Sequence, residues 1–223
     1  MHELASPVQP ADLPDLATRL EAQGADAVLA WTVAQFGGDL ALACSFQDCV
    51  IVDLAVRHAP RLEVVFLDSG SHFPETLEYV EEVRARYRLN LSVTQPGPEA
   101  EAWPCGTEEC CRWRKVEPLA LALRGKGAWV TGLKRCDGAT RASIQVLEWD
   151  QNRGMVKVNP LAAWSDAEVE AYALEHGLPS HPLSSRGYPS IGCAPTTLPV
   201  AAGADPRSGR WAGTDKAECG LHA

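Results

Sequence analysis

The order of strands and helices predicts an α/β protein with an open, mostly parallel twisted sheet and helices on both faces. Short apolar runs of strand length alternate with helical segments between residues 39 and 131, and polar turns follow two of these runs. In sheets of this kind ligands bind at the carboxyl ends of the strands. The two polar turns therefore mark the expected site.

Residues 1–38 are predicted to be helical and to pack on the main domain. Apolar residues recur at helical spacing in 13–25 and 26–36, and Gly37-Gly38 ends the second helix as a C-cap would. The first twenty residues carry acids and prolines where a secretory signal needs a basic start and an apolar core, and no run reaches the length of a membrane span. We therefore expect a cytoplasmic protein that does not enter a membrane.

The main domain is expected over 39–200, with a separate C-terminal segment at 201–223. Its apolar runs predict strands at 40–44, 62–67, 89–93 and 128–131. Helices are predicted at 49–58, at 74–88, where Pro74 gives a start, and from the capping box Ser165-Asp-Ala-Glu168 to about His176.

Positive charge is concentrated in one part of this acidic chain. The whole chain carries a net charge of −9, yet the segment 110–141 has eight Lys and Arg against two acids, 8 − 2 = +6. A nucleic-acid binder more often shows a basic balance over the whole domain. The segment therefore predicts a pocket for a small anion and no nucleic-acid partner.

Cys219 is the candidate nucleophile. It lies beside a glycine and three residues before His222, close to the end of the chain, where a thiol has solvent access. Lys216 and His222 favour the thiolate electrostatically and Glu218 opposes it. An exposed cysteine without a role, on a frayed terminus, is the competing interpretation.

The cysteine count adds a second kind of chemistry. Eight cysteines in a reducing compartment favour metal, cluster or redox chemistry over a disulfide scaffold. Cys44 and Cys49 fall at a buried strand and an apolar helix, where unpaired cysteine is usually a small core residue.

Five motifs occur in an order that resembles one enzyme family. They are Ser45-Phe-Gln-Asp48, Leu67-Asp-Ser-Gly70, Cys110-Cys111 with Arg114-Lys-Val-Glu-Pro118, Thr131-Gly-Leu-Lys-Arg135 with Thr140-Arg141, and Glu218-Cys-Gly-Leu-His222. From about Asp39 to His222 the chain resembles the assimilatory adenylyl-sulfate and phosphoadenylyl-sulfate reductases. The resemblance implies an adenine nucleotide alpha hydrolase-like fold.

The resemblance also implies a mechanism. Cys219 matches the family nucleophile, which attacks the sulfur of the activated sulfate, displaces AMP and becomes an S-sulfocysteine. Thioredoxin then releases sulfite, so the C-terminal tail is expected to be mobile enough to reach both partners. Members of the family commonly associate, which leaves a homo-oligomer as an open expectation.

The residues that match the family's substrate site hold the nucleotide, its phosphate or the sulfate. They are Ser45, Phe46, Gln47, Asp48, Leu67, Asp68, Ser69, Gly70, Lys115, Gly132, Lys134, Arg135, Arg141, Arg207, Arg210 and His222. Lys134 stands where arginine is usual, which keeps the charge and weakens forked contact. For Asp68, capping of the next helix is an equally ordinary interpretation.

The cysteines decide the branch of the family, and here the chain departs from the pattern. The adenylyl-sulfate branch carries a [4Fe-4S] cluster on a tandem pair and a later Cys-x-x-Cys, and the phosphoadenylyl branch lacks all four. Cys110, Cys111 and Cys193 match three ligands, but Thr196 takes the fourth place. Either Cys105 or Cys136 substitutes, or an oxygen ligand completes the cluster, or the cluster is absent. An adjacent cysteine pair is otherwise an oxidation liability, so a cluster and the adenylyl-sulfate substrate are the preferred prediction.

Three alternatives remain. An ATP pyrophosphatase shares the sheet plan, but the turn at Ser45 lacks that class's glycines. A non-catalytic zinc or cluster module is the second, although adjacent cysteines are poor for paired zinc spacing. A phosphoadenylyl-sulfate reductase without a cluster is the third, since Thr196 fits drift toward that branch.

Overall fold

The computed structural model describes residues 8–222 and confirms the mostly parallel α/β fold. Six strands form one sheet in the order β3-β2-β1-β4-β6-β5. Their bounds are β1 Leu40–Ala43, β2 Glu63–Leu67, β3 Asn90–Thr94, β4 Ala128–Val130, β5 Leu147–Asp150 and β6 Met155–Val158. β4 runs parallel to both β1 and β6, and β5 is antiparallel to β6.

The chain divides into two compact units that interleave along the sequence. The first comprises residues up to Ala43, Val50–Glu63 and Gly125–His176; the second comprises Cys44–Cys49, Val64–Arg124 and Gly177 onward. The predicted consecutive segments 1–38, 39–200 and 201–223 remain a prediction. Residues 1–7 of the first segment and Ala223 of the last lie outside the described residues.

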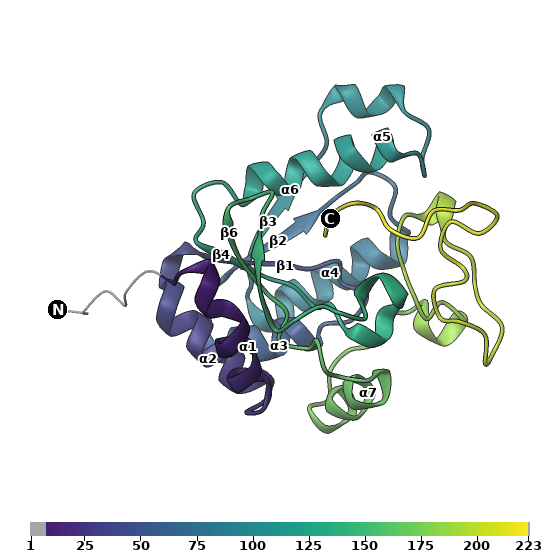
Figure 1. Ribbon diagram of the computed structural model, residues 1–223. Helices are drawn as coiled ribbons and strands as arrows, with labels where there is room; N and C mark the ends of the chain where they lie inside the picture. Colours follow the sequence, from purple (N-terminus) through teal and green to yellow (C-terminus); the bar gives the residue numbers. More distant parts are fainter. Residues whose placement is uncertain (1–7, 223) are drawn as a thin grey trace. The chain divides into compact units, whose positions relative to one another are not determined.

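The first unit holds four helices with β1, β4, β5 and β6. The helices are α1 Leu13–Glu21, α2 Ala25–Phe36, α3 Val50–His58 and α7 Asp166–Glu175. α1 packs against α2 and β5, and α2 packs against α3 (Figure 1). Strand residues Leu42, Val130 and Val158 are fully buried, because a central strand of such a sheet is covered on both sides.

The helix ends follow the sequence with small shifts. α2 ends at Phe36, and its C-cap Gly37 takes the left-handed φ of 51° that a glycine accepts without a steric cost. Ser165 and Glu168 form the predicted capping box of α7. The first helix ends at Glu21, four residues before the predicted 25, and Gly24 with φ 91° separates it from α2.

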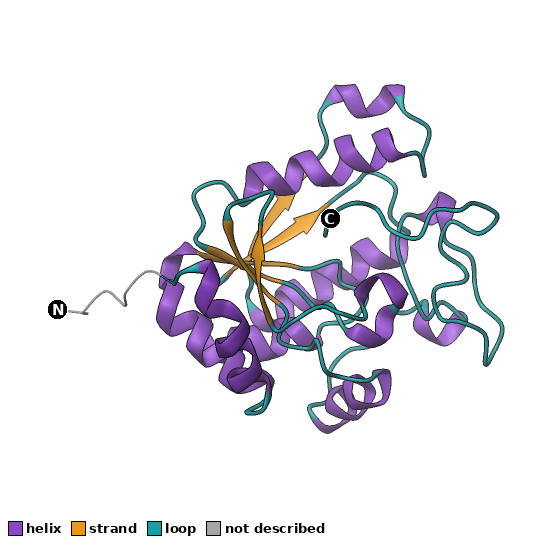
Figure 2. Cartoon of the chain, viewed as in Figure 1, coloured by secondary structure: helices purple, strands orange, loops and turns teal. Residues whose placement is uncertain are grey.

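The second unit holds β2 from Val64 on, β3 and the remaining helices. These are α4 Pro74–Tyr87, α5 Glu108–Cys111, the π-helical turn Arg112–Val116 and α6 Glu117–Ala122. Beyond residue 177 this unit is loop, apart from 3-10 turns at Ser184–Arg186 and Ala194–Thr196 and the bridge Thr197↔Arg210 (Figure 2). Binding and catalytic residues often lie on loops that a rigid scaffold holds in position.

Further 3-10 turns connect the elements at Pro10–Asp12, Gly37–Asp39, Pro98–Ala102, Arg135–Asp137 and Ala139–Arg141. None of the helices in residues 8–222 combines the length and the apolar character that a membrane crossing needs.

Candidate functional site

The turn after β1 belongs to the second unit and is held from within. Phe46 has a left-handed φ of 56°, and its fully buried ring meets Phe66 edge to face at 5.5 Å. The Gln47 amide donates to the Pro189 carbonyl at 3.2 Å and accepts from the Ile191 N–H at 3.0 Å. The turn thus fixes the loop that leads to Cys193, while Ser45 stays exposed and Asp48 half-buried.

The turn after β2 is organised by Asp68. One carboxylate oxygen accepts from the Gly70 N–H at 3.0 Å and the other from the Gln95 amide at 3.1 Å. The helix that follows, α4, has Phe73 at its N-cap and no side-chain cap, so the helix-capping interpretation of Asp68 is wrong. Leu67 ends β2, and its carbonyl accepts from His72 at 2.9 Å.

Ser69 connects this turn to two functional segments. It is fully buried, its carbonyl accepts from Arg114 Nη1 at 2.8 Å, and its hydroxyl lies 3.6 Å from Cys193 Sγ. Gly70 has φ 68°, and a side chain there would meet Arg114 Nη1. The turn is therefore packed against both the π-helical segment and the cysteine loop.

The tandem cysteines are the last two residues of α5, after which the helix changes its winding. The Thr107 hydroxyl accepts from the Cys110 N–H at 3.1 Å and so caps α5, and Cys110 and Cys111 are 2% and 4% exposed. The five residues after Cys111 form a π-helical turn, a feature common at functional sites. This turn positions Lys115.

The Lys115 ammonium interacts electrostatically with three cysteine thiols. Burial alone would lower the pKa of the Lys115 ammonium, yet the thiol groups of Cys193, Cys219 and Cys111 raise it above its ordinary value. Burial likewise would raise the pKa of Cys193, but Lys115, Ser69 and Arg210 together lower it. A cationic centre therefore lies among three cysteines that come from distant parts of the sequence.

Arg210 supplies the second cation of this centre. Its Nη1 donates to the Ile191 carbonyl at 3.1 Å and lies 3.4 Å from Ser190 Oγ, and its guanidinium stacks over Trp211 at 4.7 Å. Burial lowers the pKa of Arg210. Its Nε is buried and has no hydrogen-bond partner within residues 8–222. Such an unused donor suits an anionic ligand.

The C-terminal tail docks on the second unit through two cations. Arg207 Nη2 donates to the Ala217 carbonyl at 3.0 Å and lies 3.4 Å from a Glu218 carboxylate oxygen. Lys216 Nζ donates to Cys111 Sγ at 3.2 Å. Lys216, expected to favour the Cys219 thiolate, thus donates to a different thiol.

Cys219 lies half-buried at the same centre. The charge of Cys219 acts on Lys115, Arg210 and Cys111, which places the thiol in the same electrostatic environment as these two cations. Gly220 beside it has φ 81°, which allows the sharp turn of the tail. His222 is half-buried in the last described turn.

A fourth thiol adjoins the three predicted cluster ligands. Cys193 is 5% exposed, and Cys105 interacts electrostatically with both Cys193 and Cys110. Burial, followed by the charges of Cys193 and Cys110, raises the pKa of Cys105 to about 11. A set of thiol donors with Lys115 nearby fits an iron–sulfur cluster, which takes thiolates and carries net negative charge.

The remaining predicted anion ligands belong to the first unit, where they have other partners. Lys134 Nζ lies 2.7 Å from Asp137 and 3.5 Å from Asp166, and Arg141 Nη1 donates to Asp137 at 2.8 Å. Gly132 lies against Ile51, which a side chain at position 132 would approach to 3.2 Å. A binding role for these three stays a prediction.

Arg135 forms the strongest of these contacts. Its two terminal nitrogens each donate at 2.7 Å to one oxygen of Glu21, and its Nε donates to the Ile144 carbonyl at 2.8 Å. The hydrogen bond from Arg135, larger than the opposing effect of burial, lowers the pKa of Glu21. The Arg135 guanidinium thus makes the forked contact that was expected for a substrate anion with the carboxylate of Glu21, the last residue of α1.

Cys136, Asp137 and Asp166 also lie close enough together to hold one ion. The Lys134 ammonium already occupies the space beside both acids, and Cys136 donates to the Trp164 carbonyl at 3.3 Å. This group is therefore a neutralised surface network.

The sequence did not identify Trp211, Arg114 or Gln95 as parts of the site. Trp211 adopts φ 49°, uncommon for an aromatic residue, and contacts the cations of both Arg210 and Lys216. Its position directly after Arg210 was the available signal. Arg114 begins the motif that contains Lys115 but was assigned no role, and nothing in the sequence marked Gln95. The roles of both residues depend on turns distant in the chain.

Comparisons with known proteins agree with this architecture. The phosphoadenosine phosphosulfate reductase domain family matches residues 39–199. The adenosine 5'-phosphosulfate reductase of Mycolicibacterium smegmatis is 45% identical over 95% of each chain. The phosphoadenosine 5'-phosphosulfate reductase of Gloeobacter violaceus is 44% identical over 95% of this chain and 93% of that protein. The phosphoadenylyl-sulfate reductase crystal structure from Candida auris superposes with a TM-score of 0.75 at 27% identity, covering 86% of this chain and 98% of that one.

Proposed function

Because this chain belongs to the phosphoadenosine phosphosulfate reductase family, we propose that it reduces adenylyl sulfate to sulfite and AMP in sulfate assimilation. The observation that carries this proposal is the position of Cys219 beside Lys115 and Arg210 in the second unit. The attack needs a nucleophilic thiol and an anionic substrate held beside it, and Lys115 and Arg210 supply cations for that anion at the same centre.

The reaction proceeds in two displacements. The Cys219 thiolate attacks the sulfur of the sulfate group, a sulfur–sulfur bond forms, and the bond between that sulfur and the bridging oxygen breaks. AMP leaves with the electron pair, and Cys219 carries a sulfonate. A dithiol then attacks Cys219 Sγ and expels sulfite, and its second thiol resolves the mixed disulfide, so the dithiol is oxidised and Cys219 returns to its thiol form.

Lys115 and Arg210 have two tasks in this scheme. Before the attack they draw the anionic substrate to the site, and during it they contact the oxygens of the sulfate and phosphate. The unpartnered Nε of Arg210 supports the second task, since it is a buried donor without an acceptor among residues 8–222. The Ser45 and Asp68 turns, at the ends of β1 and β2, are proposed to bind the nucleoside.

We assign a [4Fe-4S] cluster to Cys110, Cys111 and Cys193. When bound, it supplies a fixed electrostatic centre next to the reacting groups. Lys115 and Lys216 then act on its thiolates, because hydrogen bonds to the sulfurs tune such a cluster. Lys216 also anchors the tail through the Gly106 and Thr107 carbonyls at 2.9 and 3.0 Å.

Thioredoxin is the proposed dithiol partner, and the cytoplasm, which keeps thiols reduced, is the proposed compartment. In the structure the tail is docked by contacts from Lys216 and Arg207, so presenting the Cys219 adduct to a protein requires their release. The mobile tail therefore remains part of the proposal.

Phosphoadenylyl sulfate is the second candidate substrate, because a relative named for it is 44% identical to this chain. The four adjoining thiols favour adenylyl sulfate, since the cluster accompanies that substrate in the resemblance. The rates of sulfite release from adenylyl sulfate and from phosphoadenylyl sulfate, measured at equal concentration, distinguish the two substrates. An iron-free protein that uses only the 3'-phosphorylated nucleotide would overturn the assignment.

Replacement of Cys219 tests the proposed function. Cys219→Ser is expected to abolish sulfite release while leaving AMP binding intact, because the hydroxyl is a far weaker nucleophile than the thiolate. Cys136→Ser is the matched control, since Cys136 contacts Trp164 in the first unit, and it should retain activity. Sulfite release by Cys219→Ser at the parent rate would refute the mechanism.

A further inference from the structure

The position that normally completes the Cys-x-x-Cys pair is occupied by Thr196. Its hydroxyl donates to the Cys193 carbonyl at 3.4 Å within the turn Ala194–Thr196. A threonine hydroxyl is also a poor ligand for iron in a sulfide cluster, which takes thiolates. The fourth donor must therefore come from elsewhere in the chain.

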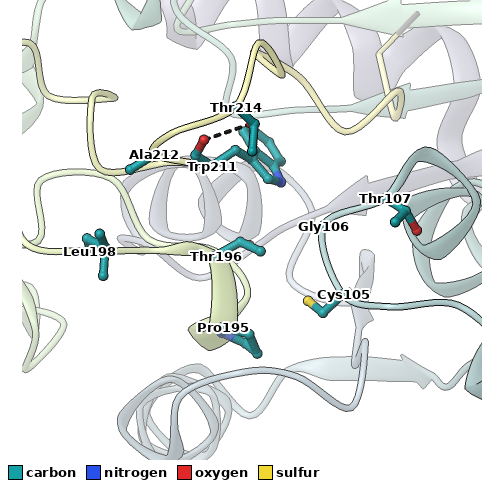
Figure 3. Close-up of a pocket in the computed structure, with 9 residues that line it drawn as sticks. All are labelled: Cys105, Gly106, Thr107, Pro195, Thr196, Leu198, Trp211, Ala212 and Thr214. Carbon is teal, nitrogen blue, oxygen red and sulfur yellow. Dashed lines mark hydrogen bonds between the residues drawn. The ribbon is translucent and has the colours of Figure 1, made fainter.

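The segment before the tandem cysteines passes directly over Thr196. Gly106 has φ 98°, and a side-chain carbon added there would lie 2.9 Å from Thr196 Cγ2. Cys105, Gly106, Thr107, Thr196 and other residues line one cavity, and the sulfur of Cys105 is turned toward the side where Thr196 and Pro195 lie (Figure 3). The glycine thus permits a close approach that brings the neighbouring cysteine to the threonine.

The Cys105 thiol also interacts electrostatically with two of the other ligands. These are Cys193, in the loop after residue 177, and Cys110, in α5. Cys105 is part-exposed, so iron can reach it. The four thiols of Cys105, Cys110, Cys111 and Cys193 therefore gather within one unit.

We propose that Cys105 is the fourth ligand of the cluster and replaces the thiolate that Thr196 cannot supply. Each Cys105 iron–sulfur bond forms with release of the thiol proton to solvent. The proposal rests on the cluster assigned above, and it extends that assignment to a residue outside the family's ligand pattern.

The other cysteines have different surroundings. Cys136 is exposed and donates to the Trp164 carbonyl at 3.3 Å. Cys49 is fully buried in contact with the Pro179 carbonyl, and Cys44 accepts from the Phe46 N–H at 3.3 Å. Among these four, and within the described residues, Cys105 is the one that lines a cavity together with Thr196.

Iron retention in anaerobically purified full-length variants tests the proposal. The parent chain should contain a complete [4Fe-4S] cluster by iron and acid-labile sulfide analysis, with a Mössbauer spectrum of sulfur-coordinated iron. In Cys105→Ser the rate of iron loss to a chelator should rise at least about tenfold, the low end of what loss of even an outer-shell partner costs. Cys136→Ser should match the parent.

A rescue variant separates ligation from folding. Thr196→Cys in the Cys105→Ser background restores a thiolate at the usual position and should recover iron retention, which a merely misfolded protein would not do. Thr196→Val, which removes only the hydroxyl, should retain iron like the parent if Cys105 is the ligand.

Each outcome decides between hypotheses. Full iron retention in Cys105→Ser together with iron loss in Thr196→Val would overturn the proposal in favour of an oxygen ligand. Full retention in both would exclude both residues as ligands. A parent chain that holds zinc or no metal would overturn the cluster as well, whereas a cluster-loaded parent with unaffected Cys105→Ser would overturn only the role of Cys105. The proposed attack by Cys219 is measured separately through its adduct.

Discussion

Gly192 stands where any side chain would displace Arg210. A carbon added at this glycine would overlap the Arg210 guanidinium, and its backbone does not adopt the left-handed region that favours glycine. The expected effect of Gly192→Ala is therefore steric. The guanidinium must leave its contacts with Ser190, Ile191 and Trp211 or shift the loop that holds Cys193.

The size of the effect follows from those contacts. Forcing a methyl group into a packed site costs about 1–3 kcal/mol. Loss of the charged hydrogen bond to the Ile191 carbonyl at 3.1 Å removes about 1.5–3 kcal/mol, part of which a relaxed loop recovers. We expect a net loss of about 2–3 kcal/mol, or roughly 4–12 °C in Tm for a chain of this size.

The assay compares Gly192→Ala with Gly38→Ala by thermal unfolding and by adenylyl-sulfate kinetics. Gly38 has no neighbouring atom within 4 Å of an added carbon, so it reports the effect of the methyl group without a clash. Gly192→Ala should also raise KM, because Arg210 is displaced from the anion centre. Equal Tm and KM for the two variants would refute the assigned position of Arg210.

Two further predictions concern His181 and Lys216. His181 is 2% exposed; its Nδ1 accepts from the Leu183 N–H at 3.1 Å and its Nε2 lies 3.0 Å from Thr76 Oγ1, and burial lowers its pKa to about 4. Below about pH 6.5 the His181 imidazole binds a proton in the unfolded chain, whereas in the folded chain it stays neutral. The free energy of unfolding should therefore have its maximal value above pH 6.5 and be about 2 kcal/mol smaller at pH 5. Urea unfolding at pH 7 and 5 measures this, and an equally steep loss in His181→Gln would assign it to other groups. Lys216→Met removes the donor to Cys111 at 3.2 Å and should speed chymotryptic cleavage of the tail; an unchanged cleavage rate would show that this contact does not hold the tail.

The sequence predicted the fold best where burial dictates a pattern. The strands at Leu40–Ala43 and Glu63–Leu67 are short apolar runs, and the helix at Pro74–Tyr87 carries a proline start. β5 and β6 were missed, because each has four residues and mixes charge with apolar side chains. Lys157 in β6 is an example. A lysine in a sequence predicts an exposed position, but this side chain is only 7% exposed, because Glu148 at 3.7 Å allows its charge to be buried.

The candidate site was predictable in its residue types and less so in its pairings. The sequence identified Cys110, Cys111 and Cys193 and left the fourth donor open among Cys105, Cys136 and oxygen. The cavity that Cys105 shares with Thr196 favours one of these options. This proximity depends on how a loop beyond residue 177 packs on the segment before α5, which no local pattern encodes.

The hydrogen bond of Lys216 was not predictable from sequence for a related reason. Closeness in sequence suggested an electrostatic effect on Cys219, which stays a prediction, whereas the docked tail lets Lys216 donate to Cys111. The direction of Lys115 is set by a π-helical turn, which sequence periodicity does not reveal.

The most direct test of the account is the mass of the C-terminal peptide after incubation with adenylyl sulfate in the absence of a reductant. The peptide that contains Cys219 should gain the mass of one sulfonate group and lose it again, with release of sulfite, when reduced thioredoxin is added. A peptide of unchanged mass from a protein that nevertheless binds the nucleotide would contradict the attack of Cys219 on the activated sulfur.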